Sequence, residues 1–432
     1  MNLLKISTNN LKDKPLTTSL SILLMALGIA IISLLLLAGK QIEEKFSRNV
    51  AGIDMVVGAK GSPLQLILAS IYQIDSPTGN ISMEEANRLT RSPLVKSTIP
   101  LSMGDSYKGY RIVGSNEKYL AHFQAEFESG KVFSQAMEMV VGSKVAKNLS
   151  LKVGDAFSSQ HGFDGEGEAH KEKQFKVVGV LKTTNSVLDA LLITPLESVW
   201  AVHEEHHEEE VGKGANALKL LEEDNENVGA SSIRPHNEHD EHDIGANSIR
   251  PSQEITSLLV KFRNPAMGMM MARSINQNST LQTATPAIEI NRLFALLGVG
   301  VDALKWIALV IIIVSGLSVF VSLYNSLKER KYEMALMLSM GASRTKLFLL
   351  LLLEGLIISV IGFIIGIFLS RVGLWIMSEN VEQNFHYDFN VLSLLTEEFY
   401  LFLGALFIGL LAAAIPSLGI YNINISKTLA DE

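Results

Sequence analysis

The sequence predicts a membrane protein with four transmembrane helices, arranged as one helix, a large α+β extracytoplasmic domain and three further helices. Three observations predict this class. The 432-residue chain has four long apolar runs, a long polar stretch separates the first run from the others, and Lys and Arg gather in the short segments on one side. Hydrophobic residues make up 47% of the chain and charged residues 19%, which fits membrane spans joined to a folded outer domain.

The four apolar runs cover residues 16–39, 307–324, 347–370 and 400–415. A helix needs about 20 apolar residues to cross ~30 Å of hydrocarbon, so each run with its flanks can span a membrane. The first run follows a basic stub and could be read as a signal peptide. Its length and the lack of a small-x-small cleavage pattern before Lys40 favour a retained anchor.

The positive-inside rule gives the orientation, because Lys and Arg close to helix ends are retained on the cytoplasmic side. The N-terminal stub carries Lys5, Lys12 and Lys14. The segment between the second and third spans carries Lys328, Arg330, Lys331, Arg344 and Lys346. The loop between the third and fourth spans is acidic beyond Arg371. We therefore expect both termini in the cytoplasm and the long polar stretch outside.

In chain order, the prediction is a cytoplasmic stub (1–15), a first span (16–39) and an outer domain (40–301) with a His- and acid-rich loop (202–251). A second span (302–324), a cytoplasmic coupling segment (325–346), a third span (347–370), a short external loop (371–398), a fourth span (399–420) and a cytoplasmic tail (421–432) follow. Within the outer domain, residues 111–115 and 177–181 have strand patterns, and residues 86–89 and 144–149 have helical ones. The chain has no cysteine, so this domain must be held by its own core.

Several function classes are disfavoured. The net charge is −8 and no basic face exists outside the short cytoplasmic segments, which argues against nucleic-acid binding. No Gly-x-x-x-x-Gly-Lys-Ser/Thr motif occurs, so any ATP hydrolysis must take place on a separate subunit. Neither a nucleophile elbow nor a Ser-His-Asp pattern rises above chance. We expect a chain that is noncatalytic by itself.

The coupling segment carries the most specific local pattern. Its residues at helical spacing are Tyr332, Glu333, Leu336, Met337 and Met340. Gly341 suits the end of this helix and Ser343 suits the N-cap of the next one. The pattern predicts a short amphipathic helix at the membrane surface, and a Met-rich helix face suits contact with another protein. A charged connector that only satisfies the positive-inside rule is the alternative.

The stretch 329–337, with Gly341-Ala-Ser-Arg344 and Glu354-Gly355, resembles the signature of the MacB/FtsX-type ABC transporter permeases, which include the lipoprotein-releasing permeases. Residues 140–155, 175–181 and 193–200 resemble the outer domain of that family, and residues 412–416 and 426–430 resemble its C-terminal end. The resemblance extends over nearly the whole chain.

The resemblance implies the membrane subunit of an ABC complex in the inner membrane of a bacterium. Two permease copies would pair with two ATP-binding subunits, which hold the ATP, and the connector would contact those subunits. The candidate ATPase-coupling residues are Glu329, Arg330, Glu333, Met337, Gly341 and Arg344.

The loop 202–251 departs from the family pattern. Six of the ten histidines lie in it: His203, His206, His207, His236, His239 and His242. A short polar repeat, 229–235 and 245–251, indicates an insertion that buries no core. Imidazole is a good ligand for Zn²⁺, Cu²⁺ and Ni²⁺, and spacings of three or four residues place side chains on one helix face. We predict metal capture by these residues, with zinc as first choice and copper and nickel as alternatives; the other interpretation is a solvated acidic loop.

Two further features lie outside that loop. Glu354 is the main ionisable residue well inside the spans, and it is predicted either to pair with a basic group or to couple the connector to helix movement. The spans otherwise offer too few polar groups for an ion pathway, which argues against an ion-conducting importer. Four methionines, at 267 and 269–271, are predicted to pack against the core of the outer domain.

The predicted function is a permease subunit that transmits ATP-driven motion to its outer domain, for export or extraction linked to zinc handling. Two alternatives stay open. One is a nontransporting mechanotransmitter that activates a periplasmic partner, and the other is a metal-binding membrane protein without an ATPase. Contact with membrane lipid is expected, a periplasmic or outer-membrane partner is left open, and the cargo is not specified.

Overall fold

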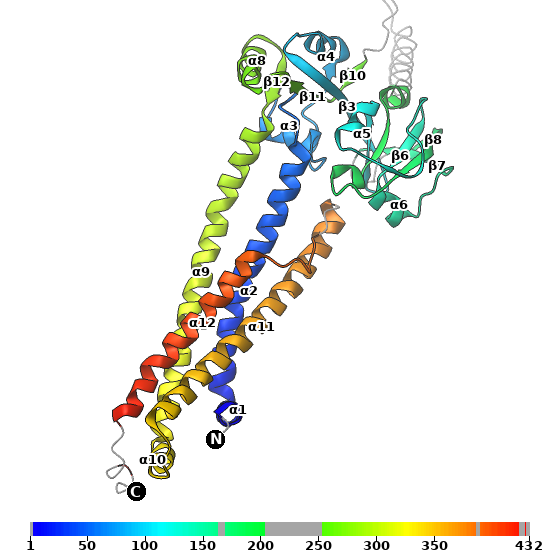
Figure 1. Ribbon diagram of the computed structural model, residues 1–432. Helices are drawn as coiled ribbons and strands as arrows, with labels where there is room; N and C mark the ends of the chain where they lie inside the picture. The colour runs from blue at the N-terminus through cyan, green and yellow to red at the C-terminus, as the bar shows by residue number, and fades with distance from the viewer. Residues whose placement is uncertain (1–2, 163–168, 204–252, 386–388, 423–427, 429–432) are drawn as a thin grey trace, which may run out of the picture. The chain divides into compact units, whose positions relative to one another are not determined.

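The computed structural model describes residues 3–162, 169–203, 253–385, 389–422 and 428. The chain forms two compact units. One is helical and combines Met1–Glu44 with Leu293–Glu432, and the other is an α+β unit formed by Lys45–Arg292 (Figure 1). The two long helices α2 and α9 pass from one unit into the other.

Among the described residues of the helical unit, four helices are long and apolar enough to cross a membrane. They are α2 (Pro15–Val50), α9 (Pro286–Glu329), α11 (Arg344–Phe385) and α12 (Thr396–Ser417). The shorter elements are α1 (Leu3–Asp13), α10 (Lys331–Ser339) and the 3₁₀ turn η2 (Leu418–Asn422). One apolar helix therefore precedes the α+β unit and three follow it, which confirms the predicted one-plus-three arrangement.

Three of these helices continue beyond the apolar runs in the sequence. Helices α2 and α9 have 36 and 44 residues. At 1.5 Å per residue they are roughly 54 and 66 Å long, against ~30 Å of hydrocarbon. Helix α11 runs on to Phe385, so much of the segment 371–398, predicted as a loop, is helical. Hydropathy marks where a helix leaves the apolar layer, and charged residues from Lys40 onward do not stop α2.

Glycine allows α11 to pack closely against both neighbouring helices. A Cβ at Gly366 would lie 2.8 Å from the carbonyl oxygen of Ala26 and from the Ile29 side chain on α2. On another side of α11, a Cβ at Gly355 would lie 2.5 Å from Ala413 on α12. Small residues at such crossings are the usual means of bringing membrane helices together, because no hydrophobic driving force acts between helices in lipid.

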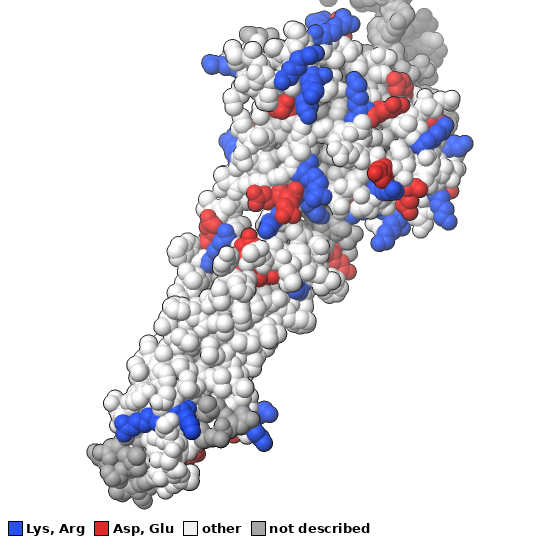
Figure 2. All heavy atoms as spheres, in the orientation of Figure 1, with Lys and Arg blue, Asp and Glu red and all other residues white. Residues whose placement is uncertain are grey.

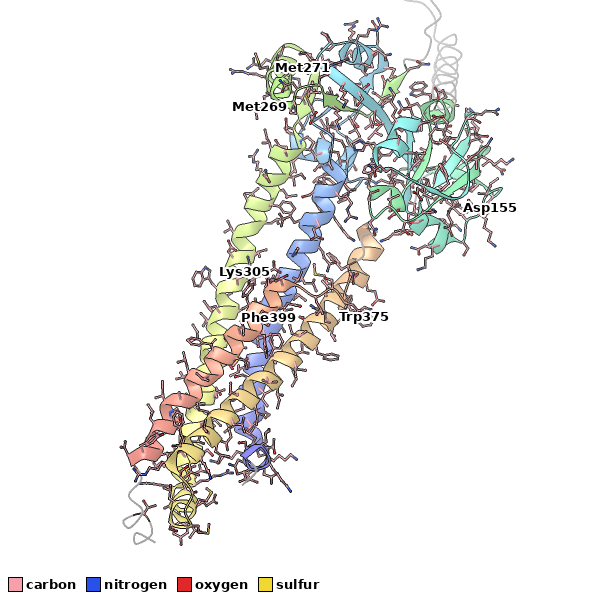
Figure 3. The ribbon with its side chains drawn as sticks, in the orientation of Figure 1. Asp155, Met269, Met271, Lys305, Trp375 and Phe399 are labelled. Atoms are coloured by element: carbon pink, nitrogen blue, oxygen red, sulfur yellow. The ribbon has the colours of Figure 1, made fainter. Side chains whose placement is uncertain are left out.

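Much of the outer surface of the helical unit is apolar. On the face shown in Figure 2, a long stretch of this unit carries no charged residue. Lys and Arg gather at the end that holds the connector, the segment between α9 and α11 that contains α10. Trp375 on α11 and Phe399 on α12, both labelled in Figure 3, are 57% and 60% exposed. Large apolar side chains exposed along these helices fit a lipid environment.

The α+β unit is built on a ten-stranded mixed sheet in the order β12-β1-β11-β3-β4-β9-β6-β8-β5, with β7 beside β3 and β8. The strands are β1 (Met55–Ala59), β3 (Val95–Tyr107), β4 (Tyr110–Ser115), β5 (Phe127–Gly130), β6 (Glu138–Val141), β7 (Ala156–His161), β8 (Ala169–Leu181), β9 (Leu192–Pro195), β11 (Ser257–Phe262) and β12 (Leu281–Ala284). A separate two-stranded sheet joins β2 (Ile81–Ser82) and β10 (Glu254–Ile255).

The long strand β3 belongs to two lobes. Its first part pairs with β11, and its second part pairs with β7 and, on both sides of a register shift between Met103 and Ser106, with β4. The first lobe has a core formed by β1, β11 and β12 with α4 (Met83–Thr90) and α8 (Pro265–Asn278). The second lobe has its own core, formed by β4, β6, β7, β8 and β9 with α6 (Ser143–Leu149).

The remaining short helices are α3 (Pro63–Ser70), α5 (Glu117–His122), the 3₁₀ turn η1 (Val187–Ala190) and a helical segment at 196–203. The strands predicted at 111–115 and 177–181 lie in β4 and β8, and the helices predicted at 86–89 and 144–149 lie in α4 and α6. These local predictions are confirmed. They were possible because each element has its own pattern of apolar residues in consecutive sequence.

The methionines of α8 correct one prediction. Met271 packs partly against the core of the first lobe, as expected. However, Met267, Met269 and Met270 are 41%, 65% and 73% exposed. Helix α8 presents positions 268, 271, 272 and 275 to the sheet, and the other three methionines fall outside this stripe. A run of adjacent methionines cannot all face one core from a helix.

Candidate coupling site

The connector between α9 and α11 forms a short helix with the predicted glycine stop and serine cap. Helix α10 ends at Ser339, and Gly341 follows with a φ of +96°, a left-handed conformation that glycine adopts without strain. The amide of Ala342 donates to the carbonyl of Met337 at 3.0 Å. The Ser343 hydroxyl then accepts from the amide of Lys346 at 3.3 Å, so Ser343 caps the start of α11.

Helix α10 has one buried face and one exposed apolar row. Met334 and Ala335 are buried and pack with Leu347, Leu351 and Ile420. On the other face, Tyr332, Leu336 and Met340 are 41%, 44% and 72% exposed. These three residues, spaced four apart, form one row along α10 and its C-cap residue Met340, which we call the α10 stripe. An exposed apolar row within a charged connector indicates a contact surface.

The predicted coupling residues lie at different depths around this helix. Glu333 is exposed beside the α10 stripe, whereas Met337 packs partly against the buried face. Arg344, exposed at the start of α11, donates to the carbonyl of Tyr421 in η2 at 2.8 Å. Glu329 ends α9, and Arg330 connects α9 to α10. The helical spacing of Tyr332, Leu336 and Met340 was visible in the sequence. The sequence did not show that these three are exposed whereas Met337 is partly buried.

Charged and polar groups join the connector to α1 and α11. The Arg330 guanidinium, 12% exposed, donates to the Asp13 carboxylate at 2.9 Å and to the Asn10 carbonyl at 3.4 Å. The amide group of Asn10 donates to the Glu354 carboxylate at 2.7 Å. Lys14 forms an ion pair with Glu329. We call this set the N-terminal polar cluster: Asn10, Asp13, Lys14, Glu329, Arg330 and Glu354.

A second polar cluster, which sequence reasoning missed, lies elsewhere in the helical unit. Arg371 on α11 forms an ion pair with Glu398 on α12 at 2.8 Å, and their side chains are only 13% and 6% exposed. The Glu398 carboxylate also accepts from the Ser33 hydroxyl on α2 at 2.7 Å and from the amide of Leu395 at 3.3 Å. Three long helices therefore meet at one carboxylate. The opposite charges of Arg371 and Glu398 were the only signal in the sequence.

Within the α+β unit, the end of α2 contacts the segment after α3, a helix that packs on β1 and β12 of the first lobe, and η1, which packs on α6 of the second lobe. The Tyr72 hydroxyl, just after α3, donates to the carbonyl of Phe46 at 2.9 Å, and the two rings stack 4.3 Å apart. The amide of Val187 at the start of η1 donates to the side chain of Asn49 at 3.0 Å, and Asn49 is 1% exposed. This end of α2 is therefore fixed to two separate parts of the unit.

Of the predicted metal ligands, the structure describes His203. Its Nε2 atom lies 3.6 Å from the buried carboxylate of Asp105, which also accepts from the Ser159 hydroxyl at 2.9 Å. The residues His206, His207, His236, His239 and His242 lie outside the described residues. Among the residues that the structure does describe, no group of three or more His, Cys, Asp or Glu side chains could hold a metal ion.

Comparison with known proteins gives the family. Residues 18–228 match the MacB-like periplasmic core domain, and residues 306–425 match the C-terminal region of the FtsX-like permeases. These matches include the first span, most of the α+β unit, the connector and the three C-terminal spans. No curated protein sequence matches the chain.

Two solved structures are similar to it at 13% identity. The periplasmic region of MacB from Actinobacillus actinomycetemcomitans has a TM-score of 0.32, and the similarity covers 58% of this chain and 97% of that one. The extracellular domain of the noncanonic ABC-type transporter YknZ from Gram-positive bacteria has a TM-score of 0.28, with 54% and 99% covered.

The two family matches occur in the order that the fold requires. The MacB-like match begins within the first apolar helix and continues into the α+β unit, and the FtsX-like region contains the connector with its flanking helices. The family implies an ATP-binding subunit as partner. This chain belongs to the MacB/FtsX-like ABC transporter permeases, multi-pass membrane proteins with a MacB-like periplasmic core domain.

Proposed function

We propose that this chain is the noncatalytic membrane subunit that transmits ATP-driven motion from a separate ATP-binding subunit to its periplasmic domain. The observation that carries this proposal is the α10 stripe. Three exposed apolar side chains, Tyr332, Leu336 and Met340, stand on a charged connector between two membrane helices. Such a row is buried when a partner protein docks on it.

The candidate coupling residues have distinct roles in this proposal. Glu333 contacts the ATP-binding subunit together with the stripe, because it is exposed beside it. Met337, Gly341 and Arg344 hold α10 in place through the buried face, the left-handed turn and the bond to Tyr421. Glu329 and Arg330 connect α10 to the N-terminal polar cluster.

The long helices supply the route from the connector to the periplasmic domain. Helix α9 precedes the connector directly, and α2 and α9 each exceed the length that a span requires. The end of α2 is fixed to both lobes through Phe46 and Asn49. A shift of these helices therefore moves the parts of the periplasmic domain to which they are fixed.

The location and partners follow from the same proposal. Both termini face the cytoplasm of a bacterium, the spans lie in its inner membrane in contact with lipid, and two copies of the chain pair with two ATP-binding subunits. The work done is export or extraction, in contact with a periplasmic or outer-membrane partner. The alternative is a nontransporting mechanotransmitter that activates a periplasmic partner. The gathering of Lys and Arg at the connector end supports the orientation (Figure 2).

Substitution of the stripe tests the proposal. Met340→Asp places a charge on the apolar row, and we expect it to lower both capture of the cognate ATP-binding subunit and the ATP turnover of the complex at least tenfold. Met270→Asp on α8 is the matched control, because Met270 is 73% exposed and Met340 is 72% exposed. Co-purification and ATP turnover of the complex in lipid nanodiscs would measure both. Equal capture by the two variants would contradict the docking role of the stripe, and no capture by the unaltered chain would favour a membrane protein without an ATPase.

We further propose that the work is linked to zinc through the histidine-rich segment. The support is chemical, because clustered imidazoles bind zinc well and the first of them, His203, already lies beside the Asp105 carboxylate. Calorimetric titration of the full chain in detergent should give micromolar zinc binding, and deletion of 204–243 should abolish it. His122→Ala, a histidine of α5, serves as control and should bind zinc as the unaltered chain does. Binding that survives the deletion would refute this link.

A further inference from the structure

The backbone joins the connector directly to α9 and α11, but it does not join the connector directly to α2. Helix α9 ends at Glu329 and α10 begins at Lys331, so one residue separates them. Helix α11 begins at Arg344, a short turn after α10. Both therefore follow the connector through the backbone. Helix α2 has no such link, so any displacement of the connector can reach it only through noncovalent contacts.

The connector itself reaches α2 through α1, and α2 also packs laterally on α9 and α11. Helix α1 ends at Asp13, and Lys14 alone separates it from α2. The Arg330 guanidinium donates to Asp13 at 2.9 Å, and Lys14 pairs with Glu329. The last residue of α1 and the residue before α2 are thus both held by residues at the start of the connector.

The same cluster ties α1 to the membrane helix α11. Glu354 is 2% exposed and accepts from the Asn10 side chain at 2.7 Å. One turn earlier, the Ser7 hydroxyl donates to the carbonyl of Leu350 at 3.3 Å. A buried carboxylate within a membrane helix is costly without partners, whereas an apolar residue would pack there at no such cost. We attribute the presence of Glu354 to its hydrogen bond with Asn10, which fixes the position of α1.

We propose that the N-terminal polar cluster is the coupling element that carries connector movement into α2, with Asn10 and Glu354 as positioning residues and Arg330 as the contact that drives α1. This inference rests on the proposed function, since it assumes that an ATP-binding subunit moves the connector. Helix α2 then moves with α9 and α11 as long as the cluster is intact. When the cluster is broken, α9 still follows the connector through the backbone, whereas α2 keeps only its lateral packing on α9 and α11.

The experiment compares the two helices that enter the periplasmic domain. The chain has no cysteine, so single fluorophores can be attached through Ser47→Cys on α2 or Asn291→Cys on α9, both exposed positions. Each probe is read in nanodiscs with the cognate ATP-binding subunit, with and without ATP. Asn10→Asp sets two carboxylates against each other, and the swap Asn10→Asp with Glu354→Gln restores a hydrogen bond of reversed polarity.

We expect Asn10→Asp and Arg330→Gln each to lower the ATP-dependent signal of the α2 probe at least fivefold, and to change that of the α9 probe less than twofold. The swap should restore the α2 signal. Arg88→Gln is the matched control, because it breaks an exposed Arg–Glu pair at 2.8 Å in α4 and should change neither signal.

Two results would overturn the inference: an α2 signal unchanged by both variants, or loss of both signals together without rescue by the swap, which indicates that the cluster only holds the helices in place. A different failure, no ATP-dependent signal from either probe in the unaltered complex, would refute the proposed function and the inference with it.

Discussion

At the scale of single residues, the membrane unit depends on a few buried polar contacts whose partners lie far apart in sequence. Glu398 brings together Arg371, Ser33 and Leu395, from three long helices and the turn before α12. Charges in such an environment are tolerated only when they are paired and hydrogen-bonded. The pair of Arg371 and Glu398 therefore specifies how α2, α11 and α12 meet.

Removal of one member of this pair should be worse than removal of both. Glu398→Leu leaves a buried guanidinium uncompensated, and we expect a loss of about 3–5 kcal/mol in the free energy of unfolding. Addition of Arg371→Met to Glu398→Leu should recover much of that loss. Lys305→Met, which breaks the exposed pair with Asp302 at 3.1 Å, is the control and should cost at most about 1 kcal/mol.

Unfolding of the detergent-solubilised chain, followed by far-UV circular dichroism, would measure these differences. A double variant as unstable as Glu398→Leu alone would show that the charges stabilise the unit through other contacts than their mutual pair.

At the scale of elements, glycine decides which helices approach each other. Gly409 on α12 faces Ser359 and Gly355 on α11, and a Cβ there would meet both residues. Gly404, five residues earlier on the same helix, has no atom within 4 Å of such a Cβ. The two glycines look alike in the sequence and differ only in what lies opposite.

These two positions should respond to alanine with opposite signs. Gly409→Ala overpacks the crossing of α11 and α12 and should cost about 1–3 kcal/mol in stability. Gly404→Ala has open space, so a gain of roughly 0.5–1 kcal/mol is expected from the better helix propensity of alanine. Thermal unfolding of the two variants in the same detergent provides the measurement. A loss of equal size at both positions would show that helix packing is not what Gly409 serves.

At the scale of the whole molecule, one chain combines a membrane unit with a periplasmic domain of two lobes. The connector, α1 and both chain ends belong to the helical unit, while each lobe of the domain has its own core. The proposed mechanism requires these parts to face opposite sides of the membrane. This topology can be tested without regard to cargo.

The absence of native cysteine makes that test direct. Ser339→Cys places a thiol at the end of α10, and Ser129→Cys places one in the exposed strand β5. A membrane-impermeant maleimide added to intact spheroplasts should label Ser129→Cys and leave Ser339→Cys unlabelled until the membrane is opened. Labelling in the reverse order would refute the cytoplasmic assignment of the connector and of both termini.

Much of this fold was predictable because its signals are local. Apolar runs long enough to span gave the four membrane helices, and strand and helix patterns gave β4, β8, α4 and α6. The glycine stop and serine cap of the connector were equally local. The ends of the helices were harder to predict. Helices α2, α9 and α11 continue beyond the apolar runs, because a charged segment can remain helical outside the hydrocarbon.

The candidate site was predictable in position but not in detail. The sequence placed Glu333 and Met337 on one amphipathic helix, and the fold exposes one and partly buries the other. It marked Glu354 as unusual and gave no means of naming Asn10, which precedes it by more than 300 positions, as its partner. The histidine-rich segment stays a prediction, tested by the zinc titration.

The sequence by itself determined the number and order of the membrane helices, the place of the periplasmic domain and the family, because hydropathy and short motifs are properties of consecutive residues. Only the tertiary structure decided which face of α10 is free, which glycines lie at a crossing, and that Arg330 and Glu354 meet through α1. Those facts depend on pairings between residues distant along the chain, and such pairings are fixed when helices pack against one another.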